Sequence, residues 1–160
     1  MLVYLADLRH KTITLTPDAM PLGIGYLAAY GAKIFGNEVQ FKLFADTELL
    51  LEELRHTKPA VLGVTNYCWN YAVHCRVLRY ARGLYPDVLT VMGGPNISLD
   101  HKIEEARLRQ TPGLDLYVIN EGEEAFVRVL GRYFDSGLRK DRMLRDPLPS
   151  SIFVDPGSGL

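Results

Sequence analysis

Ala60-Val-Leu-Gly-Val64 is an uninterrupted apolar run near the middle of the 160-residue chain, and this run decides the fold class. A strand with one face in water alternates apolar and polar residues, whereas a strand that helices cover on both faces is apolar throughout. The run therefore predicts a central strand of a parallel sheet. Lys58-Pro59 ends the segment before it, and Thr65-Asn66 follows with the first polar side chains.

Short apolar runs alternate with helical segments on both sides of this strand. We expect strands at residues 2–8, 39–45, 60–64, 88–92 and 116–119, and helices at 21–35, 48–56, 69–84, 99–109 and 122–134. Strands that alternate with helices predict a parallel sheet with helices on both faces. The sequence therefore predicts an α/β domain of five parallel strands.

The composition excludes several classes of protein. Hydrophobic residues make up 48% of the chain, which is typical of a folded domain and excludes wholesale disorder. The formal charge of −1 gives no basic field for nucleic acid or an anionic membrane. The longest uncharged apolar stretch, Ala19–Ala32, is too short for a membrane span, and no signal peptide is recognisable at the N-terminus. We therefore expect a cytoplasmic protein.

The last part of the chain differs from the rest. Residues 137–160 are rich in arginine, lysine and proline and end in Gly157-Ser158-Gly159-Leu160. This composition is typical of a connector, so we expect a domain at residues 1–136 and a connector at 137–160.

Chemistry is expected at the carboxyl ends of the strands, where open parallel sheets bind their ligands. The Gly93-Gly94 pair would let a bulky ligand lie against the backbone, although a tight turn without a ligand would use the same residues. Tyr67, Trp69 and Tyr71 follow the central strand and indicate a broad apolar ligand surface. Glu121 at the start of the last helix could contact a polar ligand or serve the helix N-terminus.

Other ligand signatures are weaker. Gly23-Ile-Gly25-Tyr-Leu-Ala28 has the spacing of a dinucleotide fingerprint, with Asp46 at the distance of a ribose ligand, but a long loop separates it from the first strand. A nucleotide-binding oxidoreductase domain therefore stays an alternative. Of the four histidines only His10 falls at the expected functional edge. Together with Asp7 it offers two ligands, fewer than zinc requires, so no metal site is predicted.

Four motifs together resemble one family. They are Pro21-Leu-Gly-Ile-Gly-Tyr-Leu-Ala-Ala29, Val61-Leu-Gly-Val-Thr65, Val91-Met-Gly-Gly-Pro95 and Asp115-Leu-Tyr-Val-Ile-Asn-Glu-Gly-Glu-Glu-Ala-Phe126. In this order and spacing they resemble the N-terminal cobalamin (B12)-binding domain of B12-dependent radical SAM enzymes. The resemblance implies a flavodoxin-like (Rossmann-like) three-layer sandwich whose five-stranded parallel sheet has the order 2-1-3-4-5.

The resemblance also implies a cofactor site. In that family the corrin lies over the carboxyl ends of the strands, and its nucleotide tail inserts beside the sheet, flanked by the Gly-Gly loop. The implied cofactor-binding residues are Leu22, Gly23, Thr65, Asn66, Tyr67, Gly93, Gly94, Pro95, Asn96, Glu121 and Gly122. Thr65, Asn66 and Tyr67 would lie near the lower face of the cobalt.

Two positions depart from the family pattern. Asn120 replaces the first glycine of the Gly-Glu-Gly-Glu motif. Asp7-Leu-Arg-His10 places its histidine one residue later than the Asp-x-His-x-x-Gly motif does, so histidine ligation of cobalt is not predicted. These departures leave open a degenerate scaffold that binds no corrin and acts as a docking surface.

The reactive chemistry is expected elsewhere. Two cysteines cannot form the Cys-x-x-x-Cys-x-x-Cys motif of a radical SAM cluster, so we expect no catalytic residue in this chain. S-adenosylmethionine and a 4Fe-4S cluster would belong to a downstream radical SAM domain, the expected partner of this one. The closing Leu148-Pro-Ser-Ser-Ile-Phe-Val-Asp155 resembles the connector that precedes that domain. The whole enzyme would most often transfer methyl groups.

Overall fold

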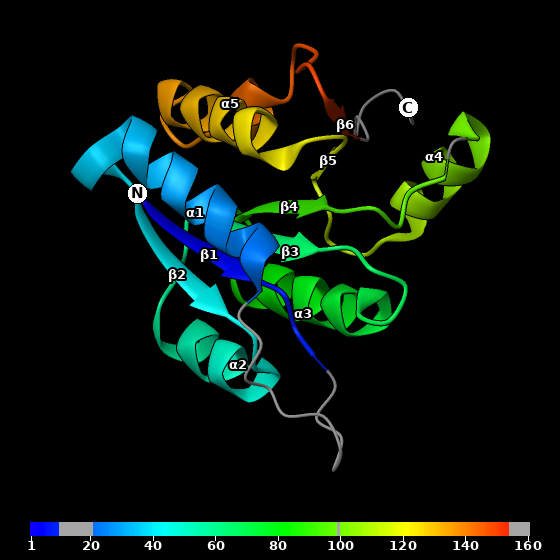
Figure 1. The fold of residues 1–160 in the computed structure, drawn as a ribbon, viewed down its shortest axis with the longest axis horizontal. Helices are drawn as coiled ribbons and strands as arrows, with labels where there is room; N and C mark the ends of the chain where they lie inside the picture. The colour runs from blue at the N-terminus through cyan, green and yellow to red at the C-terminus, as the bar shows by residue number, and fades with distance from the viewer. Residues whose placement is uncertain (10–20, 99, 154–160) are drawn as a thin grey trace.

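A computed structural model of the chain describes residues 1–9, 21–98 and 100–153, except for the side chain of His101. Strands and helices alternate as expected (Figure 1). In chain order they are β1 (Leu2–Ala6), α1 (Leu22–Phe35), the 3₁₀ turn η1 (Gly36–Glu38), β2 (Gln40–Phe44), α2 (Thr47–His56), β3 (Val61–Thr65), α3 (Tyr71–Leu84), β4 (Leu89–Gly93), α4 (His101–Gln110), β5 (Leu116–Val118), α5 (Gly122–Asp135), α6 (Lys140–Met143) and β6 (Ser151–Phe153).

The strands form one sheet in the order β2-β1-β3-β4-β5-β6. β1 to β5 are parallel, with Val3 opposite Val61 and Val64 opposite Met92. Every strand of this parallel part therefore ends at the same edge of the sheet. β3 is flanked by β1 and β4, as its apolar sequence predicts, and four of its five residues are buried.

The prediction of five parallel strands is wrong in one respect, because β6 adds a sixth strand that runs antiparallel to β5. This strand has only three residues, which is too short for a recognisable apolar pattern, and it lies in the segment interpreted as a connector. Met143 and Leu148 from the same segment are 1% and 6% exposed and belong to the core beside α5. At least to Phe153 the segment packs on the domain. A link to a further domain stays a prediction.

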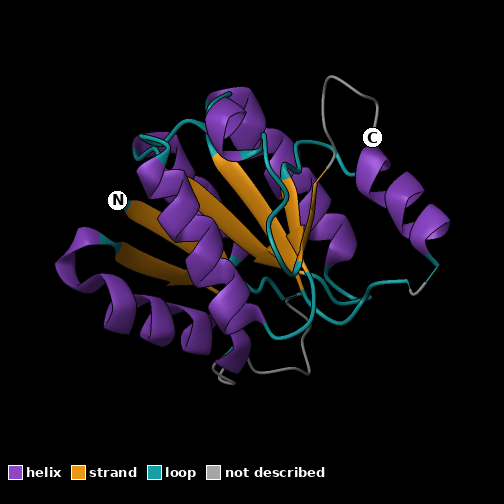
Figure 2. Cartoon of the chain, turned by 90° about the horizontal axis from the view of Figure 1, so that it is seen from above, coloured by secondary structure: helices purple, strands orange, loops and turns teal. Residues whose placement is uncertain are grey.

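Two apolar cores lie on opposite faces of the sheet, so the fold has three layers (Figure 2). α1 and α5 contribute Ile24, Phe126 and Leu130 to one core. α2 and α3 contribute Leu50, Leu54 and Leu78 to the other. Burial of these side chains is the main favourable term for folding.

Gly63 in the middle of β3 leaves room on the α1–α5 side of the sheet. A Cβ at this position would lie 2.6 Å from the Cδ2 atom of Leu5 on β1, which is closer than carbon atoms approach. Leu5 is itself 1% exposed and has little space to move. The central strand therefore carries no side chain at the point where α5 brings Phe126 to within 3.8 Å of that position.

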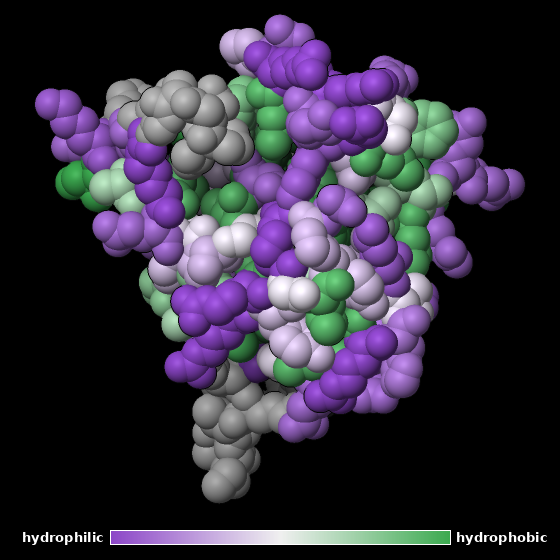
Figure 3. All heavy atoms as spheres, turned by 180° about the vertical axis from the view of Figure 1, so that it is seen from behind, coloured by the Kyte–Doolittle hydropathy of each residue, from purple (hydrophilic) through white to green (hydrophobic). Residues whose placement is uncertain are grey.

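The surface carries mixed side chains. On the face shown in Figure 3, hydrophilic residues surround scattered apolar ones, as on most soluble domains. Among the described residues, no helix combines the length and apolar character that crossing a membrane requires.

Leu148 tests whether the C-terminal segment stabilises the domain. We expect Leu148→Ala to lower the free energy of unfolding by about 2–4 kcal/mol, because the change leaves a cavity in the core beside α5. Urea unfolding followed by circular dichroism measures it. Leu49→Ala on α2 is the matched control, since Leu49 is 65% exposed and should lose less than about 0.5 kcal/mol. Equal losses in both variants would contradict the packing role of Leu148.

Candidate functional site

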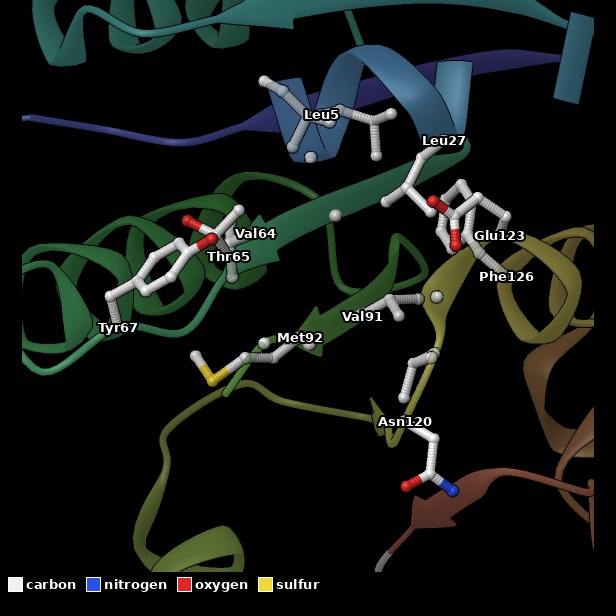
Figure 4. A pocket seen from close by; sticks show the side chains of 17 residues that line it. Leu5, Leu27, Val64, Thr65, Tyr67, Val91, Met92, Asn120, Glu123 and Phe126 are labelled. Carbon is white, nitrogen blue, oxygen red and sulfur yellow. The ribbon is translucent and has the colours of Figure 1, made fainter. Parts of the chain in front are cut away.

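A cavity of about 160 Å³ opens at the carboxyl edge of the sheet, between α1, α5 and the ends of β3 and β4 (Figure 4). Its polar side chains are few and include Thr65, Asn120 and Glu123. Its lining residues are Leu5, Gly23, Ile24, Leu27, Gly63, Val64, Thr65, Tyr67, Val91, Met92, Gly93, Gly94, Val118, Asn120, Gly122, Glu123 and Phe126. The site is thus an apolar slot with a few polar groups.

Two of the five glycines that line the cavity differ in why they are glycine. Gly94 has a φ of 136°, and a Cβ there would lie 2.7 Å from the backbone oxygen of Asn66, so only glycine fits. Gly23 on α1 differs, because no atom lies within 4 Å of the place its Cβ would take. Packing within the protein does not require glycine at position 23. Its missing side chain leaves open space inside the cavity.

A network of hydrogen bonds centred on Asn66 joins the loops after β3 and β4. The Asn66 side-chain amide donates to the Asn96 carbonyl oxygen at 2.7 Å and to the Tyr117 hydroxyl at 2.9 Å. The Asn96 amide donates back to Oδ1 of Asn66 at 3.1 Å, and the Tyr117 hydroxyl donates to the Gly94 carbonyl at 2.8 Å. Asn66 is fully buried. These contacts make Asn66 and Asn96 scaffold residues that position the Gly93-Gly94 turn.

α4 holds the same turn from outside. Arg107 donates to the Asn96 carbonyl at 2.5 Å and to Oε1 of Glu104 at 2.6 Å, and it lies 5.5 Å from the centre of the Tyr71 ring. Glu104 is 2% exposed and accepts from the Ser98 backbone N–H at 2.9 Å. A buried carboxylate with an arginine and a backbone donor is well compensated. The turn after β4 is therefore fixed on both sides.

A second network joins the ends of β1 and β3. The Thr65 hydroxyl donates to Oδ1 of Asp7 at 2.8 Å, and the Asn70 amide donates to the same oxygen at 3.1 Å. Oδ1 of Asn70 accepts from the Tyr67 backbone N–H at 2.9 Å, which sets the path of the loop between β3 and α3. Thr65 therefore lies at the edge of the cavity with its hydroxyl proton already engaged.

His74 on α3 supports this second network from below. Its Nδ1–H donates to the Thr65 carbonyl at 2.6 Å, and its Nε2 accepts from the Leu8 backbone N–H at 3.1 Å. This pattern requires the neutral ring, because a protonated ring has no acceptor. Burial lowers the pKa of His74 to about 4. His74 therefore contacts the functional edge, and the expectation that only His10 does so among the histidines is wrong. His10 lies outside the described residues.

The two helices beside the cavity begin without a side-chain cap. The residues that precede them, Pro21 before α1 and Glu121 before α5, make no capping side-chain hydrogen bond. Asp46 and Asp100, in contrast, cap α2 and α4, whereas α3 also begins without a side-chain cap. Backbone N–H groups and the positive ends of the helix dipoles therefore remain available at the cavity. Such helix starts favour anionic groups.

Asn120 explains how the chain tolerates its departure from the glycine motif. Its φ is 62°, in the left-handed region where asparagine is among the residues least penalised after glycine. The backbone thus takes the conformation that glycine would take. In Figure 4 the amide of Asn120 points away from the centre of the cavity.

An aromatic pair stands at the same edge. The rings of Tyr67 and Trp69 stack at 4.5 Å with an interplanar angle of 9°, and Trp69 is 57% exposed. Tyr71 turns elsewhere, and its hydroxyl shares a 2.8 Å hydrogen bond with Thr111. Of the three aromatic residues singled out in the sequence, two therefore form a surface beside the site.

The cofactor residues implied by the sequence divide into two groups. Six of them line the cavity: Gly23, Thr65, Tyr67, Gly93, Gly94 and Gly122. Five do not line it: Leu22, Asn66, Pro95, Asn96 and Glu121. Sequence reasoning missed the apolar walls from Leu5, Val91 and Phe126, because a residue that lines a cavity and one that fills a core give the same apolar pattern.

The other ligand signatures have less support. Gly23 and Gly25 lie inside α1, and the dinucleotide fingerprint requires them at the turn after β1, which ends at Ala6. Within the described residues, no group of three or more histidine, cysteine, aspartate or glutamate side chains could hold a metal ion.

Comparison with known proteins identifies the family. The protein-family model described as B12 binding domain matches residues 11–130 of this chain. The chain belongs to the B12-binding domain family. No curated protein matches it at a significant level. Family membership supports cobalamin as the cofactor, and the cavity of this B12-binding domain lies at the carboxyl edge of the sheet, where open parallel sheets bind their ligands.

The buried His74 predicts how stability depends on pH. The unfolded chain binds a proton on this ring below pH about 6.5, whereas the folded domain does so only below about 4. Stability should therefore fall as the pH drops through this window, by up to about 3 kcal/mol. Urea unfolding of the wild type and His74→Gln between pH 7 and 4.5 measures it. The variant, which cannot titrate here, should lose less, and parallel curves would contradict the prediction.

Proposed function

We propose that this B12-binding domain holds cobalamin with the nucleotide tail in the cavity between α1 and α5 and the corrin over the carboxyl ends of the strands. The observation that carries the proposal is the open apolar slot at Gly23. A volume of about 160 Å³ is below the roughly 300–1,000 Å³ of pockets that enclose a complete drug-sized ligand. The slot fits one arm of a larger molecule whose remainder lies outside.

The starts of the two helices offer hydrogen-bond donors to such an arm. The nucleotide tail of cobalamin carries a phosphodiester, and the uncapped N-termini of α1 and α5 offer backbone N–H donors at the cavity. Gly23 and Gly122 lie in the first turns of these helices and line the cavity. A bound group can approach the backbone closely at Gly23, whereas Leu27 Cδ2 lies 3.2 Å from the place that a Cβ of Gly122 would take. These residues fit the nucleotide tail in shape. In charge, α1 has no acidic residue in its first turn and favours the phosphodiester, whereas Glu123 and Glu124 already lie in the first turn of α5.

The residues near the expected lower face of the corrin act by positioning. Asp7, Thr65 and Asn70 hold one another, and through Asn70 they fix Tyr67 at the cavity wall. Cobalamin, when bound, supplies the cobalt centre that carries alkyl groups or electrons. The role of this chain is to bind the cofactor, orient it and exclude water from its tail.

A radical SAM domain is the proposed partner, with methyl transfer as the expected class of reaction. The support is the resemblance of the four sequence motifs in order and spacing. If the protein continues beyond Leu160, we expect a Cys-x-x-x-Cys-x-x-Cys motif there, binding a 4Fe-4S cluster and S-adenosylmethionine. The continuation of the coding sequence tests this directly, and a continuation without this motif would contradict it.

A docking surface without corrin is the second candidate. The stacked Tyr67–Trp69 pair favours it, because exposed tryptophan and tyrosine are the residues most enriched at the centres of protein interfaces. These side chains do not fill the slot, which stays open beside Tyr67. The hydroxocobalamin titration described next separates the two candidates.

Titration with hydroxocobalamin tests the proposed site with a matched pair of variants. Gly23 and Gly25 both lie in α1, and neither has an atom within 4 Å of its missing Cβ. Only Gly23 lines the cavity. We expect Gly23→Leu to lower cobalamin affinity at least tenfold by filling the slot, while Gly25→Leu leaves it unchanged. Both should fold, since leucine favours helix over glycine by up to about 1 kcal/mol.

The measurement is the change in the visible spectrum of the corrinoid and its retention on the protein after desalting. If the wild type neither shifts the spectrum nor retains the cofactor, the docking surface becomes the better hypothesis. If Gly23→Leu binds as tightly as the wild type, the nucleotide tail does not occupy this cavity.

A further inference from the structure

We propose that the cavity selects among corrinoids by their lower base, accepting the carbocyclic ring of dimethylbenzimidazole and disfavouring adenine. This inference rests on the proposed function, in which the nucleotide tail enters the cavity. Corrinoids share the macrocycle and differ in the base at the end of the tail, so the walls of the slot are where a protein can tell them apart.

The floor of the cavity is apolar. Leu5, Val91 and Phe126 are 1%, 3% and 2% exposed, and all three line the slot where Gly63 leaves the sheet without a side chain. Figure 4 shows these apolar side chains on the walls between β1, β4 and α5. A benzene ring with two methyl groups gains favourable burial against such walls.

The polar backbone atoms of the loops after β3 and β4 are already occupied. The carbonyl oxygen of Gly93 accepts from the Asn66 N–H at 2.6 Å, and that of Gly94 accepts from the Tyr117 hydroxyl at 2.8 Å. The carbonyl of Thr65 accepts from His74, and the Thr65 hydroxyl donates to Asp7. The loops around the slot are rich in polar groups, but they direct their hydrogen bonds to one another.

Two of the remaining polar side chains lie toward a second cavity. Asn120 and Glu123 line both this cavity and a neighbouring polar one of about 390 Å³, so they lie where the two meet. Tyr67 stacks on the exposed Trp69 at the other rim. The six-membered ring of a base that inserts fully passes these groups and meets the floor.

Adenine carries an exocyclic amino group and ring nitrogens on that six-membered ring. Against the apolar floor these atoms would lose their hydrogen bonds to water without replacement, because the free N–H groups of α1 and α5 lie at the helix starts proposed for the phosphodiester, and such a loss is costly for buried polar groups. Apolar pockets discriminate against an added polar group by up to about a hundredfold. We therefore expect cobalamin to bind about tenfold to a hundredfold more tightly than its adenine analogue.

Isothermal titration of the full chain with three corrinoids tests the inference. The probes are cobalamin, pseudocobalamin with adenine as the lower base, and cobinamide, which lacks the nucleotide tail. We expect cobalamin to bind most tightly of the three. Pseudocobalamin should bind at least tenfold more weakly than cobalamin, and cobinamide should also bind more weakly than cobalamin. Val91→Thr places a hydroxyl on the floor at nearly constant volume and should reduce the ratio between the two bases severalfold.

Val61→Thr is the matched control, since Val61 lies in the same core on β3 but does not line the cavity. It should destabilise the domain similarly and leave the ratio unchanged. Equal affinities for cobalamin and pseudocobalamin would overturn the inference and leave the proposed function intact. An unchanged ratio in Val91→Thr would also overturn it. Cobalamin that binds no better than cobinamide, or no binding at all, would overturn the proposed tail site itself and the inference with it.

Discussion

Asn66 is the residue on which the geometry of the site depends. It is fully buried, and its side chain and backbone together connect the end of β3 to the turn after β4 and to Tyr117 on β5. Three strand ends are thereby held in one arrangement. The same contact brings Gly94 so close to the Asn66 backbone that a side chain cannot fit. This packing with Asn66 therefore requires glycine at position 94, whether or not a ligand binds there.

Polar loops build an apolar slot because their polar groups satisfy one another. The Asn66–Asn96 network lies on one side of the edge, and the Asp7–Thr65–Asn70 network with His74 lies on the other. No buried side-chain nitrogen or oxygen among the described residues lacks a hydrogen-bond partner. Fully satisfied networks of this kind rigidify a site, whereas partly satisfied ones are costly. The chain thus keeps a rigid rim and leaves apolar atoms and glycines facing the cavity.

The sequence predicted the alternation of elements and the central position of β3, because these follow from local patterns, and the cavity lies at the sheet edge where the sequence predicts a ligand site. Ala60–Val64 is apolar in every position, and Gly36 and Pro86 mark the ends of helices. It did not predict β6, because a strand of three residues is too short to show an alternation of apolar and polar residues. It did not predict the pairing of Asn66 with Asn96, since side-chain hydrogen bonds between loops thirty residues apart leave no local signal. The role of His74 was missed for the same reason: its partners, Leu8 and Thr65, come from other elements.

Several departures from the local rules of stability lie at the cavity, and others lie outside it, namely the uncapped start of α3 and the positive φ of Leu138 and Ser150. α2 and α4 begin with aspartate caps, while α1 and α5 begin without side-chain caps and face the cavity. Gly23 weakens a helix without any packing need, and Asn120 adopts a left-handed backbone at the same edge. Each feature costs free energy in the isolated domain. Such violations are expected where a protein serves a ligand, because the lost stability can be regained on binding. At the slot these features agree with the ligand site that membership of the family indicates.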